Sequence, residues 1–181
     1  MNTDHVDTLS FMLPVLGFAA WSGTGKTTLL TRLIPRLRER GLRIAMVKHA
    51  HHAFDVDKPG KDSYELRKAG AGQMLIASSR RMALMTELDP PAEPRLPELL
   101  ARLDASRADL VLVEGFKGAR IPKIELHRPS LGKPLLFPDD PDIVAVASDA
   151  PPGRPCDRVL LDLNDLGAIT EFVLQWQRDH R

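Results

Sequence analysis

The sequence predicts an α/β protein in which helices flank a mostly parallel sheet, with a small β excursion in the middle of the chain. The first supporting observation is that apolar runs of strand length alternate with segments whose apolar residues recur at helical spacing. The second is a glycine-rich stretch, SGTGKTT at residues 22–28, that joins the first such strand to the first such helix. It supplies the second half of the phosphate-loop pattern G-x-x-x-x-G-K-S/T, so the predicted fold is of the P-loop NTPase type.

Composition and charge narrow the classes of function. The chain has 181 residues, of which 43% are hydrophobic and 27% charged, as is usual for one globular domain. Its formal net charge is only +1. Broad nucleic-acid binding needs a concentrated positive field, so we expect no nucleic-acid partner.

The remaining compositional features favour a cytoplasmic protein. The single cysteine, Cys156, cannot form an internal disulfide, which fits a reducing compartment. No apolar run approaches the roughly 18 residues that a membrane-spanning helix needs, so no membrane partner is expected. Residues 1–10 are polar and predict a flexible tail, while residues 11–181 are expected to form a single P-loop nucleotide-binding domain.

The chain is predicted to begin with a βαβ unit. Strands are expected over residues 11–20 and 42–50, with a helix over 26–41 between them. The apolar residues of this helix recur at helical spacing: Leu29, Leu30, Leu33, Ile34 and Leu37. Pro35 is expected to kink or weaken the helix, and Gly41 to end it.

A short helix and two strands are expected next. The helix is predicted over 64–71, with Asp62 or Ser63 as its cap, and the strands over 73–79 and 80–87 form the β excursion. Charged residues at helical spacing indicate a solvated helix face with salt bridges along it: Asp62, Glu65, Arg67 and Lys68.

Six further elements are expected in the second half of the chain. These are a helix over 96–106, strands over 108–116, 121–128, 143–149 and 158–163, and a helix over 164–181. The strand over 121–128 alternates apolar and polar residues, whereas the others are continuous apolar runs. The last helix carries an apolar face that is either core or a dimer interface, formed by Leu166, Ile169, Phe172, Val173 and Trp176.

The glycine-rich stretch is the strongest candidate site. In a phosphate loop, small residues let backbone N–H groups converge on phosphate oxygens at the start of a helix, a lysine neutralises the phosphates and a Ser or Thr hydroxyl binds Mg²⁺. The predicted nucleotide-binding residues are Ser22, Gly23, Thr24, Gly25, Lys26, Thr27 and Thr28. Ala20 replaces the first glycine of the pattern and is tolerable if its φ is negative. The alternative is a glycine-rich turn that binds nothing, which the strand–loop–helix context disfavours.

Two later strand ends supply further candidates. Glu114 lies near the carboxyl end of the strand over 108–116, where a carboxylate commonly holds Mg²⁺ through water, although a solvated acid is the alternative. Ser148 and Asp149 end the strand over 143–149. The Asp149 carboxylate would accept hydrogen bonds from N1–H and N2–H₂ of guanine, which adenine cannot supply, or it is a capping or turn residue.

A polar segment follows the second strand and carries His49, His51, His52, Asp55 and Asp57. Zinc binding is one interpretation, although the spacing matches no familiar structural zinc site. A solvated loop is another. We favour a switch-like loop in which Asp55 or Asp57 approaches the Mg²⁺ that Thr27 and Glu114 also bind. The role of the three histidines stays open.

Several segments together resemble one known family. They are FAAWSGTGKTTLL, KHAHHAFDVDKPGKDSYELRKAGA, ALMTE, LVLVEGFK and VAVASD, and the resemblance to the MobB family, molybdopterin-guanine dinucleotide biosynthesis adapter proteins, runs from about Leu16 to Trp176. It implies a P-loop α/β fold, GTP binding with Mg²⁺, weak GTP hydrolysis and a homodimer. It also implies a guanylyltransferase partner that attaches GMP to molybdopterin. The motif residues that the resemblance carries over are Gly23, Gly25, Lys26, Thr27, Thr28 and, as a Walker-B-like acid, Glu114.

One loop position argues for slow hydrolysis. Some dimeric relatives of P-loop proteins carry an extra lysine early in the loop, and here that position is Trp21. No arginine finger or water-positioning glutamine stands out elsewhere, and such groups contribute about 10³–10⁵ in rate in comparable systems. The sequence therefore favours a GTP-binding adapter. A partner-stimulated GTPase switch is the alternative, and a P-loop small-molecule kinase is the third hypothesis.

Overall fold

A computed structural model describes residues 11–50 and 54–181. Its contacts divide the chain into two compact units. The first unit combines the described residues up to His49 with Arg95–Arg181, and the second is Ala50–Pro94. The second unit contains the predicted β excursion, and a single domain over 11–181 stays a prediction.

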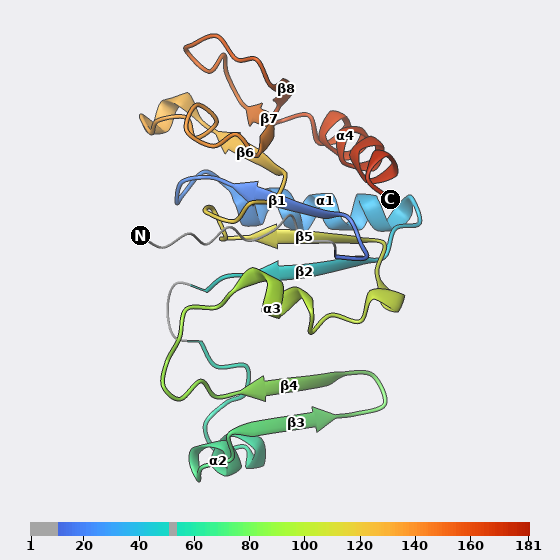
Figure 1. The fold of residues 1–181 in the computed structure, drawn as a ribbon, viewed down its shortest axis with the longest axis vertical. Coiled ribbons are helices and arrows are strands. Elements are labelled where there is room, and N and C mark those ends of the chain that lie inside the picture. The colour runs from blue at the N-terminus through green and yellow to red at the C-terminus, as the bar shows by residue number, and fades with distance from the viewer. Residues whose placement is uncertain (1–10, 51–53) are drawn as a thin grey trace. The chain divides into compact units, whose positions relative to one another are not determined.

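The first unit is built on a six-stranded parallel sheet with the strand order β2-β5-β1-β6-β7-β8 (Figure 1). The strands are β1 (Val15–Ala19), β2 (Ile44–Lys48), β5 (Leu110–Glu114), β6 (Lys123–His127), β7 (Ile143–Ser148) and β8 (Val159–Asp162). Its helices are α1 (Lys26–Glu39), α3 (Leu96–Leu100) and α4 (Leu166–Asp179), with 3-10 turns at Ala105–Arg107 and Pro129–Leu131. The predicted fold class, a parallel sheet flanked by helices in a P-loop NTPase-like arrangement, is confirmed.

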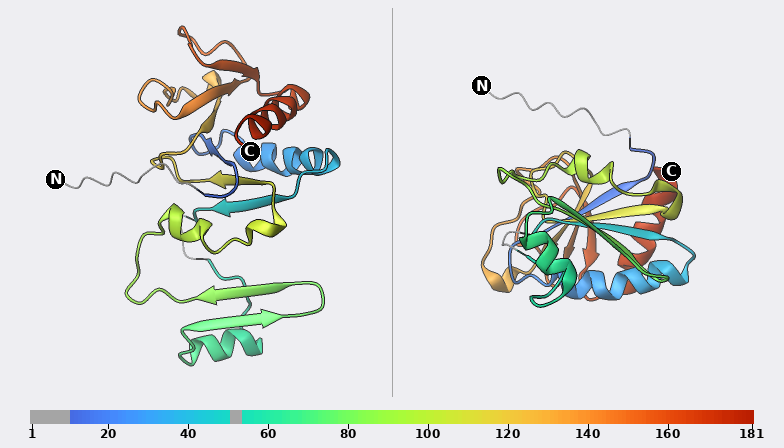
Figure 2. Two further views of the ribbon diagram at one scale, coloured as in Figure 1. Left: turned by 45° about the vertical axis from the view of Figure 1, so that its right-hand side comes forward. Right: turned by 90° about the horizontal axis from the view of Figure 1, so that it is seen from below.

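The sheet has a packed core on each face. Helices α1 and α4 lie together on one face and α3 on the other (Figure 2). Leu16 and Phe18 of β1 point into the first core, while Val15 points into the second. This alternation along a continuous apolar strand explains why the sequence showed no polar face there.

Helix α1 follows its predicted pattern, and the prediction that Pro35 kinks or weakens it stays a prediction. Leu29, Leu33 and Leu37 are buried against the sheet. Pro35 lies inside the helix and does not end it. Gly41 follows the helix with φ +88°, a conformation that favours glycine, so its predicted role in ending the helix is confirmed.

The helix predicted over 96–106 is shorter than expected. It covers only Leu96–Leu100, and a separate 3-10 turn follows at Ala105–Arg107. The carboxylate of Asp104 accepts hydrogen bonds from the Ser106 backbone N–H at 3.0 Å and from the Ser106 hydroxyl at 2.6 Å. Asp104 thus caps the 3-10 turn, which forms a separate element from the helix.

The last helix places its apolar face in the core. Leu166, Ile169, Val173 and Trp176 are all buried and belong to the core shared with α1. Phe172 packs at the margin of the same core. The sequence left the choice between core and dimer interface open, and in the structure this face is core.

The second unit consists of α2 (Asp62–Lys68) and an antiparallel hairpin of β3 (Gln73–Ala77) and β4 (Met82–Thr86). The prediction that Asp62 or Ser63 caps the helix is wrong, because the cap residue is Lys61 and no side chain caps the first turn. Glu65, within that turn, instead accepts a hydrogen bond from the Gly60 backbone N–H at 3.0 Å.

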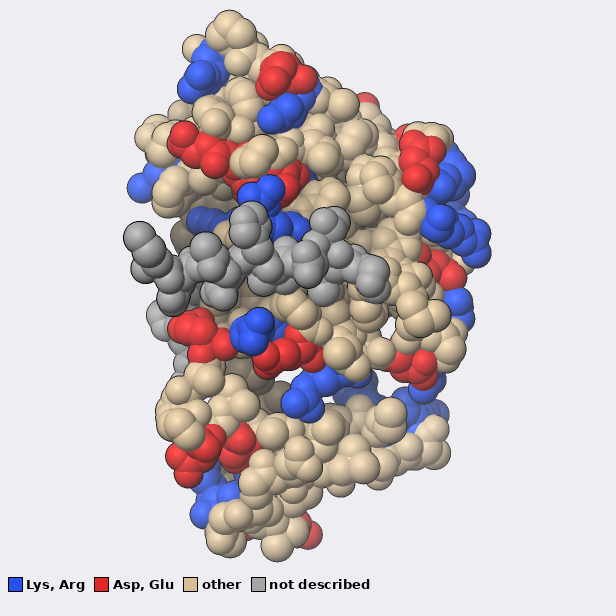
Figure 3. Space-filling view, in the orientation of Figure 1, with Lys and Arg blue, Asp and Glu red and all other residues tan. Residues whose placement is uncertain are grey.

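Two surface properties complete the description. Basic and acidic side chains are interspersed over the described residues of the face that Figure 3 shows. Among the described residues, no helix has both the length and the apolar character needed to cross a membrane.

Candidate functional site

The loop between β1 and α1 has the backbone geometry of a site for an anion. Gly23 and Gly25 have φ of +82° and +100°, which other residues rarely adopt. Gly25 is the cap residue of α1, no side chain caps that end, and its first turn has no acidic residue. The leading N–H groups of a 14-residue helix therefore lack a side-chain acceptor, a property that favours binding of a negative group.

The substitution at position 20 fits the fold. Ala20 is 0% exposed, and its methyl group belongs to the core beneath α1. No described non-glycine residue has a positive φ, so the alanine is unstrained. The expectation that alanine is tolerated here is confirmed.

Lys26 folds back over the loop. Its Nζ donates hydrogen bonds to the carbonyls of Ala20 at 3.1 Å and Trp21 at 3.4 Å. Burial lowers the pKa of Lys26; the Glu114 carboxylate opposes this effect, and the nearby Lys117 and Lys48 add to it. The ammonium thus lies among groups of its own charge, where an anionic ligand would relieve the repulsion.

The other predicted loop residues differ in how far their side chains are exposed to solvent. Thr24 is buried, and its hydroxyl donates to the Trp21 carbonyl at 2.8 Å, so this side chain holds the loop together. Ser22, Thr27 and Thr28 are exposed. The predicted contact of Thr27 with Mg²⁺ stays a prediction.

Glu114 lies at the carboxyl end of β5, on the same edge of the sheet as the loop. It is 8% exposed and is paired in register with Lys48 of β2, whose Nζ lies 3.5 Å from its Oε2. Gly115 follows with φ +94°, and a Cβ there would come within 2.9 Å of the Cβ of His49. Only glycine fits this close approach, which keeps the ends of β2 and β5 together.

Ser148 and Asp149 have partners that the sequence did not reveal. The hydroxyl of Ser148 donates to the Ala150 carbonyl at 2.7 Å. The Asp149 carboxylate is ion-paired with the Arg128 guanidinium, whose Nε donates to the Thr24 carbonyl at 3.0 Å. Arg128 thereby connects Asp149 to the glycine-rich loop. Its position at the end of the predicted strand over 121–128, directly after β6, was the available signal. Guanine recognition by Asp149 stays a prediction.

Asp55 and Asp57 bind an arginine of the second unit. Arg67 Nη2 lies 2.6 Å from Asp55 and 2.7 Å from Asp57, and Nη1 lies 2.5 Å from Glu87. Hydrogen bonding to Arg67 lowers the pKa of Asp57. Arg67 is only 8% exposed, so the prediction that it belongs to a solvated helix face is wrong.

The predicted metal ligands of this segment, Asp55 and Asp57, belong to the second unit, whereas Glu114 belongs to the first. The described residues include no group of three or more His, Cys, Asp or Glu side chains that would hold a metal ion. Metal binding by Asp55 and Asp57 stays a prediction. His49 stacks on Phe116 with ring centroids 5.1 Å apart, and His51 and His52 lie outside the described residues.

Lys117 is a further charged residue at the loop. Its Nζ lies 4.5 Å from the centroid of the Trp21 ring, and the Trp21 Nε1–H donates to the Pro134 carbonyl at 2.7 Å. The sequence shows that position 21 lacks a lysine, but it did not lead us to name Lys117 as a residue beside the loop. The available signal was a lysine three residues after Glu114, in the loop that leaves the same edge of the sheet.

Polar side chains of strand β6 hold the loops around the candidate site in place. The apolar and polar residues of this strand alternate as noted from the sequence, and the polar ones, Lys123, Glu125 and His127, are all buried. Burial raises the pKa of Glu125, while its carboxylate accepts the backbone N–H groups of Leu136 at 2.7 Å and Phe137 at 2.9 Å. Polar residues on this central strand therefore fasten loops rather than face solvent.

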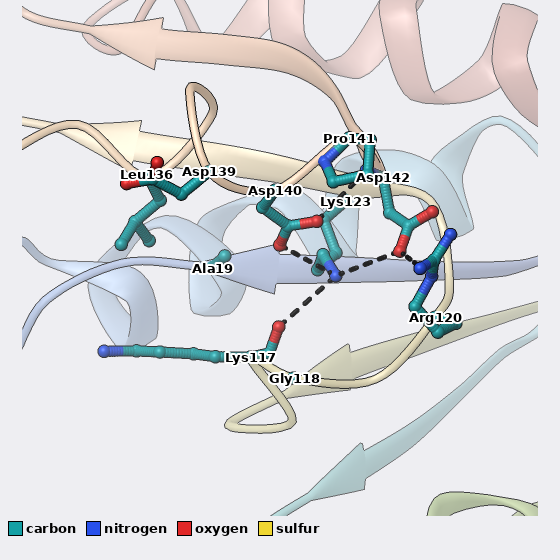
Figure 4. A pocket seen from close by; sticks show the side chains of 10 residues that line it. All are labelled: Ala19, Lys117, Gly118, Arg120, Lys123, Leu136, Asp139, Asp140, Pro141 and Asp142. Carbon is teal, nitrogen blue, oxygen red and sulfur yellow. Dashed lines mark hydrogen bonds and ion pairs between the residues drawn. The ribbon is translucent and has the colours of Figure 1, made fainter. Parts of the chain in front are cut away.

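A cavity of about 390 Å³ lies beside the end of β1 (Figure 4). Lys123 Nζ donates to the carbonyls of Ala119 at 2.6 Å and Lys117 at 3.3 Å, and it lies 2.9 Å from Asp140 Oδ2. These bonds fix the two loops that line the cavity, those leading into β6 and into β7.

Comparisons with known proteins agree on one family. The family model for molybdopterin guanine dinucleotide synthesis protein B, MobB, matches residues 15–149. The molybdopterin-guanine dinucleotide biosynthesis adapter protein of Escherichia coli (strain K12) is 54% identical over 168 residues, covering 92% of this chain and 95% of the relative. The adapter protein of the same description from Haemophilus influenzae is 46% identical over 164 residues, covering 91% and 89%.

A solved structure supports the same assignment. The crystal structure of molybdopterin-guanine biosynthesis protein B matches with a TM-score of 0.71 at 31% identity, covering 91% of this chain and 99% of that chain. The segments that suggested the resemblance lie largely within the matched residues, among them the glycine-rich loop, Glu114 and Asp149. The chain therefore belongs to the MobB family.

Proposed function

We propose that this protein is a GTP-binding adapter in molybdenum cofactor biosynthesis that assists the attachment of GMP to molybdopterin. The observation that carries the proposal is the uncapped start of α1, with Lys26 folded over the loop and Glu114 on the same sheet edge, in a chain of the MobB family. Its relatives are described as adapters in the biosynthesis of molybdopterin-guanine dinucleotide. The proposed partner is accordingly the guanylyltransferase that forms this dinucleotide.

In this proposal the loop binds the phosphates and Mg²⁺ lies between Thr27 and Glu114. The exposed hydroxyl of Thr27 and the carboxylate of Glu114 are the oxygen ligands that Mg²⁺ prefers. The ion would neutralise phosphate charge. Lys26 would exchange its hydrogen bonds to the Ala20 and Trp21 carbonyls for bonds to phosphate oxygens, which are stronger because both partners are charged.

The adapter role, rather than that of a fast enzyme, is supported by the groups around the loop. Residues 49–61 and 115–122, which follow β2 and β5, contain no glutamine to orient a water molecule. We therefore expect slow GTP hydrolysis, at a rate that lets the protein hold its nucleotide.

Isothermal titration with nucleotide and Mg²⁺ tests the proposal. We expect GTP to bind and ATP to bind at least tenfold more weakly, because Asp149 accepts hydrogen bonds that only guanine donates. Lys26→Ala should abolish tight GTP binding while circular dichroism stays unchanged, since the Lys26 ammonium contacts only loop carbonyls. Absence of GTP binding, or equal affinity for ATP, would contradict the proposal.

A partner-stimulated GTPase switch is the second candidate. It is favoured by the order of the chain, because the second unit begins two residues after Lys48, whose ammonium is paired with Glu114. Under this alternative, added guanylyltransferase raises the hydrolysis rate sharply, whereas an adapter gives a flat rate. We also propose that the protein is a homodimer, and sedimentation of the full chain tests this.

A further inference from the structure

We propose that Lys117, held over the Trp21 ring, forms with Lys26 and Lys48 a subsite for the terminal phosphoryl group of the bound nucleotide. This inference rests on the proposed nucleotide binding and extends it by naming the group that separates a triphosphate from a diphosphate. It assigns the positive charge that the loop lacks at position 21 to a lysine from another loop of the same chain.

Trp21 fixes the geometry because it is held at both ends. Its backbone carbonyl accepts hydrogen bonds from the Thr24 hydroxyl at 2.8 Å and from Lys26 Nζ at 3.4 Å. Its indole Nε1–H donates to the Pro134 carbonyl at 2.7 Å. The ring cannot turn without breaking the last bond, so it presents a stable face to Lys117 Nζ at 4.5 Å. Lys26 and Lys117 thus both contact the same residue.

The charges around this point are unbalanced. Lys26, Lys48 and Lys117 contribute three ammonium groups, and Glu114 contributes a carboxylate that lies 3.5 Å from Lys48. Lys117 forms no ion pair with any residue that the structure describes. Lys117 and Lys48 both lower the pKa of Lys26, as expected where like charges meet. A multiply charged anion would remove this repulsion, and the terminal phosphoryl group of a nucleoside triphosphate carries the required charge.

The neighbouring Lys123, unlike Lys117, has a structural role. Lys123 is 2% exposed, and its ammonium is bonded to two carbonyls and to Asp140. Figure 4 shows the Lys117 side chain extending past Ala19, away from Lys123 and its carboxylates. Lys117 is exposed, and its side chain is therefore the one that remains open to a ligand.

Lys117 should affect the binding of GTP and the binding of GDP differently. Lys117 would contact only the terminal phosphoryl group, so it should strengthen binding of GTP and leave GDP unaffected. Because charge on that group is redistributed during hydrolysis, the same ammonium should also raise the slow hydrolysis rate. A residue that merely supported the loop would affect both nucleotides equally.

The test compares the Kd of GTP and of GDP, measured by titration with Mg²⁺, in wild type and in Lys117→Met. We expect GTP binding to weaken about tenfold and GDP binding less than twofold, since one charge-assisted contact is lost. Single-turnover hydrolysis of bound GTP should fall by about tenfold as well. Trp21→Phe should keep part of the effect, because a ring remains beneath Lys117, whereas Trp21→Ala should match Lys117→Met or exceed it.

The matched control is Lys68→Met. Lys68 Nζ also lies over an aromatic ring, 5.3 Å from the centroid of Tyr64, but it belongs to the second unit. This variant loses the same charge and the same kind of contact, and it should leave both Kd values unchanged. Unchanged GTP binding in Lys117→Met, or equal weakening of GTP and GDP, overturns the inference. Absence of GTP binding in wild type instead contradicts the proposed function itself.

Discussion

The two units of this protein are stabilised in different ways. In the first unit, every residue of β1, β5 and β6 is buried, and the strands pack against helices on both faces. In the second unit, apolar residues of the hairpin are exposed: Leu75 is 64% exposed, Met82 69% and Leu84 53%. None of the hydrophobic core clusters among the described residues includes a residue of the second unit.

Ion pairs take the place of a core in the second unit. Arg67 binds three carboxylates, those of Asp55 and Asp57, which precede α2, and that of Glu87, which follows β4. A guanidinium suits this role because its five N–H donors point in fixed directions. Arg67 thus holds the segments of the second unit together, whereas many buried side chains hold the first unit together.

The difference in packing between the two units bears on the candidate nucleotide site. The glycine-rich loop, Lys26, Glu114, Lys117 and Arg128 all belong to the first unit, where a packed sheet holds them in place. A unit with few buried apolar contacts opens at a lower free energy, and such segments are the ones that respond to ligands and partners.

Removing core volume from the first unit should have the largest effect. Leu112 lies on β5 and is 0% exposed, so Leu112→Ala should lower the free energy of unfolding by about 3–4 kcal/mol. Denaturant unfolding measures this change. A loss below about 1 kcal/mol would show that the core relaxes around the cavity and that burial is not what holds the first unit.

Removing the arginine should open the second unit alone. Arg67→Met keeps the length of the side chain but leaves Asp55, Asp57 and Glu87 without their shared partner, and these carboxylates then repel one another. We expect amide hydrogen exchange to accelerate across residues 54–94 and to stay unchanged in β1 and β5. Acceleration in both units would mean that Arg67 serves the whole chain. Lys68→Met is the control, because Lys68 is the neighbouring cation on α2.

The contrast between local packing and contacts of distant residues also explains which features could be predicted from the sequence alone. Strands β1, β2, β5 and β7 were predicted from continuous apolar runs, and the glycine-rich loop from its spacing. These features depend on local pattern, which a single sequence displays. The same local patterns placed Lys26 and Glu114 at one edge of the sheet, and their binding of nucleotide and Mg²⁺ stays a prediction.

Residues that act through distant partners were missed or misjudged. Arg67 had the pattern of a solvated helix face, yet its partners Asp55 and Glu87 are 12 and 20 residues away. Lys117 contacts Trp21, and Arg128 contacts Thr24 at a separation of 104 residues. The burial of Glu125 and Lys123 could not be predicted either, because alternation in a strand does not show that loops will cover its polar face. Such pairings depend on topology, which local pattern does not encode.

An ion pair on the first unit should contribute less than its core. The carboxylate of Asp109 accepts hydrogen bonds from Arg43 Nε at 3.0 Å, Nη2 at 2.8 Å and the backbone N–H at 2.8 Å. The Arg43 side chain and backbone lower the pKa of Asp109 to about 2. Asp109→Asn should cost about 1 kcal/mol at pH 7, a figure that allows for screening by solvent.

The pH dependence of this pair has a definite sign. Because the folded-state pKa of Asp109 lies below the unfolded value of about 3.9, the stabilisation is complete above that value and is lost as pH falls towards about 2. Unfolding curves of wild type and Asp109→Asn should therefore converge as pH falls through this window. Curves that stay equally separated down to pH 2 would show that the Asp109 carboxylate is not what Arg43 stabilises.

The smallest effect is expected on the exposed hairpin, where the substitution matches the one made in the core. Leu84 is 53% exposed and pairs with Leu75 across the hairpin. Leu84→Ala should change the free energy of unfolding by about 0.5 kcal/mol, because most of the side chain already contacts water. The same leucine-to-alanine change would thus cost several times more at Leu112 than at Leu84. Equal costs at the two strands, measured under one set of conditions, would mean that the hairpin is covered in solution and that its apolar residues are buried there.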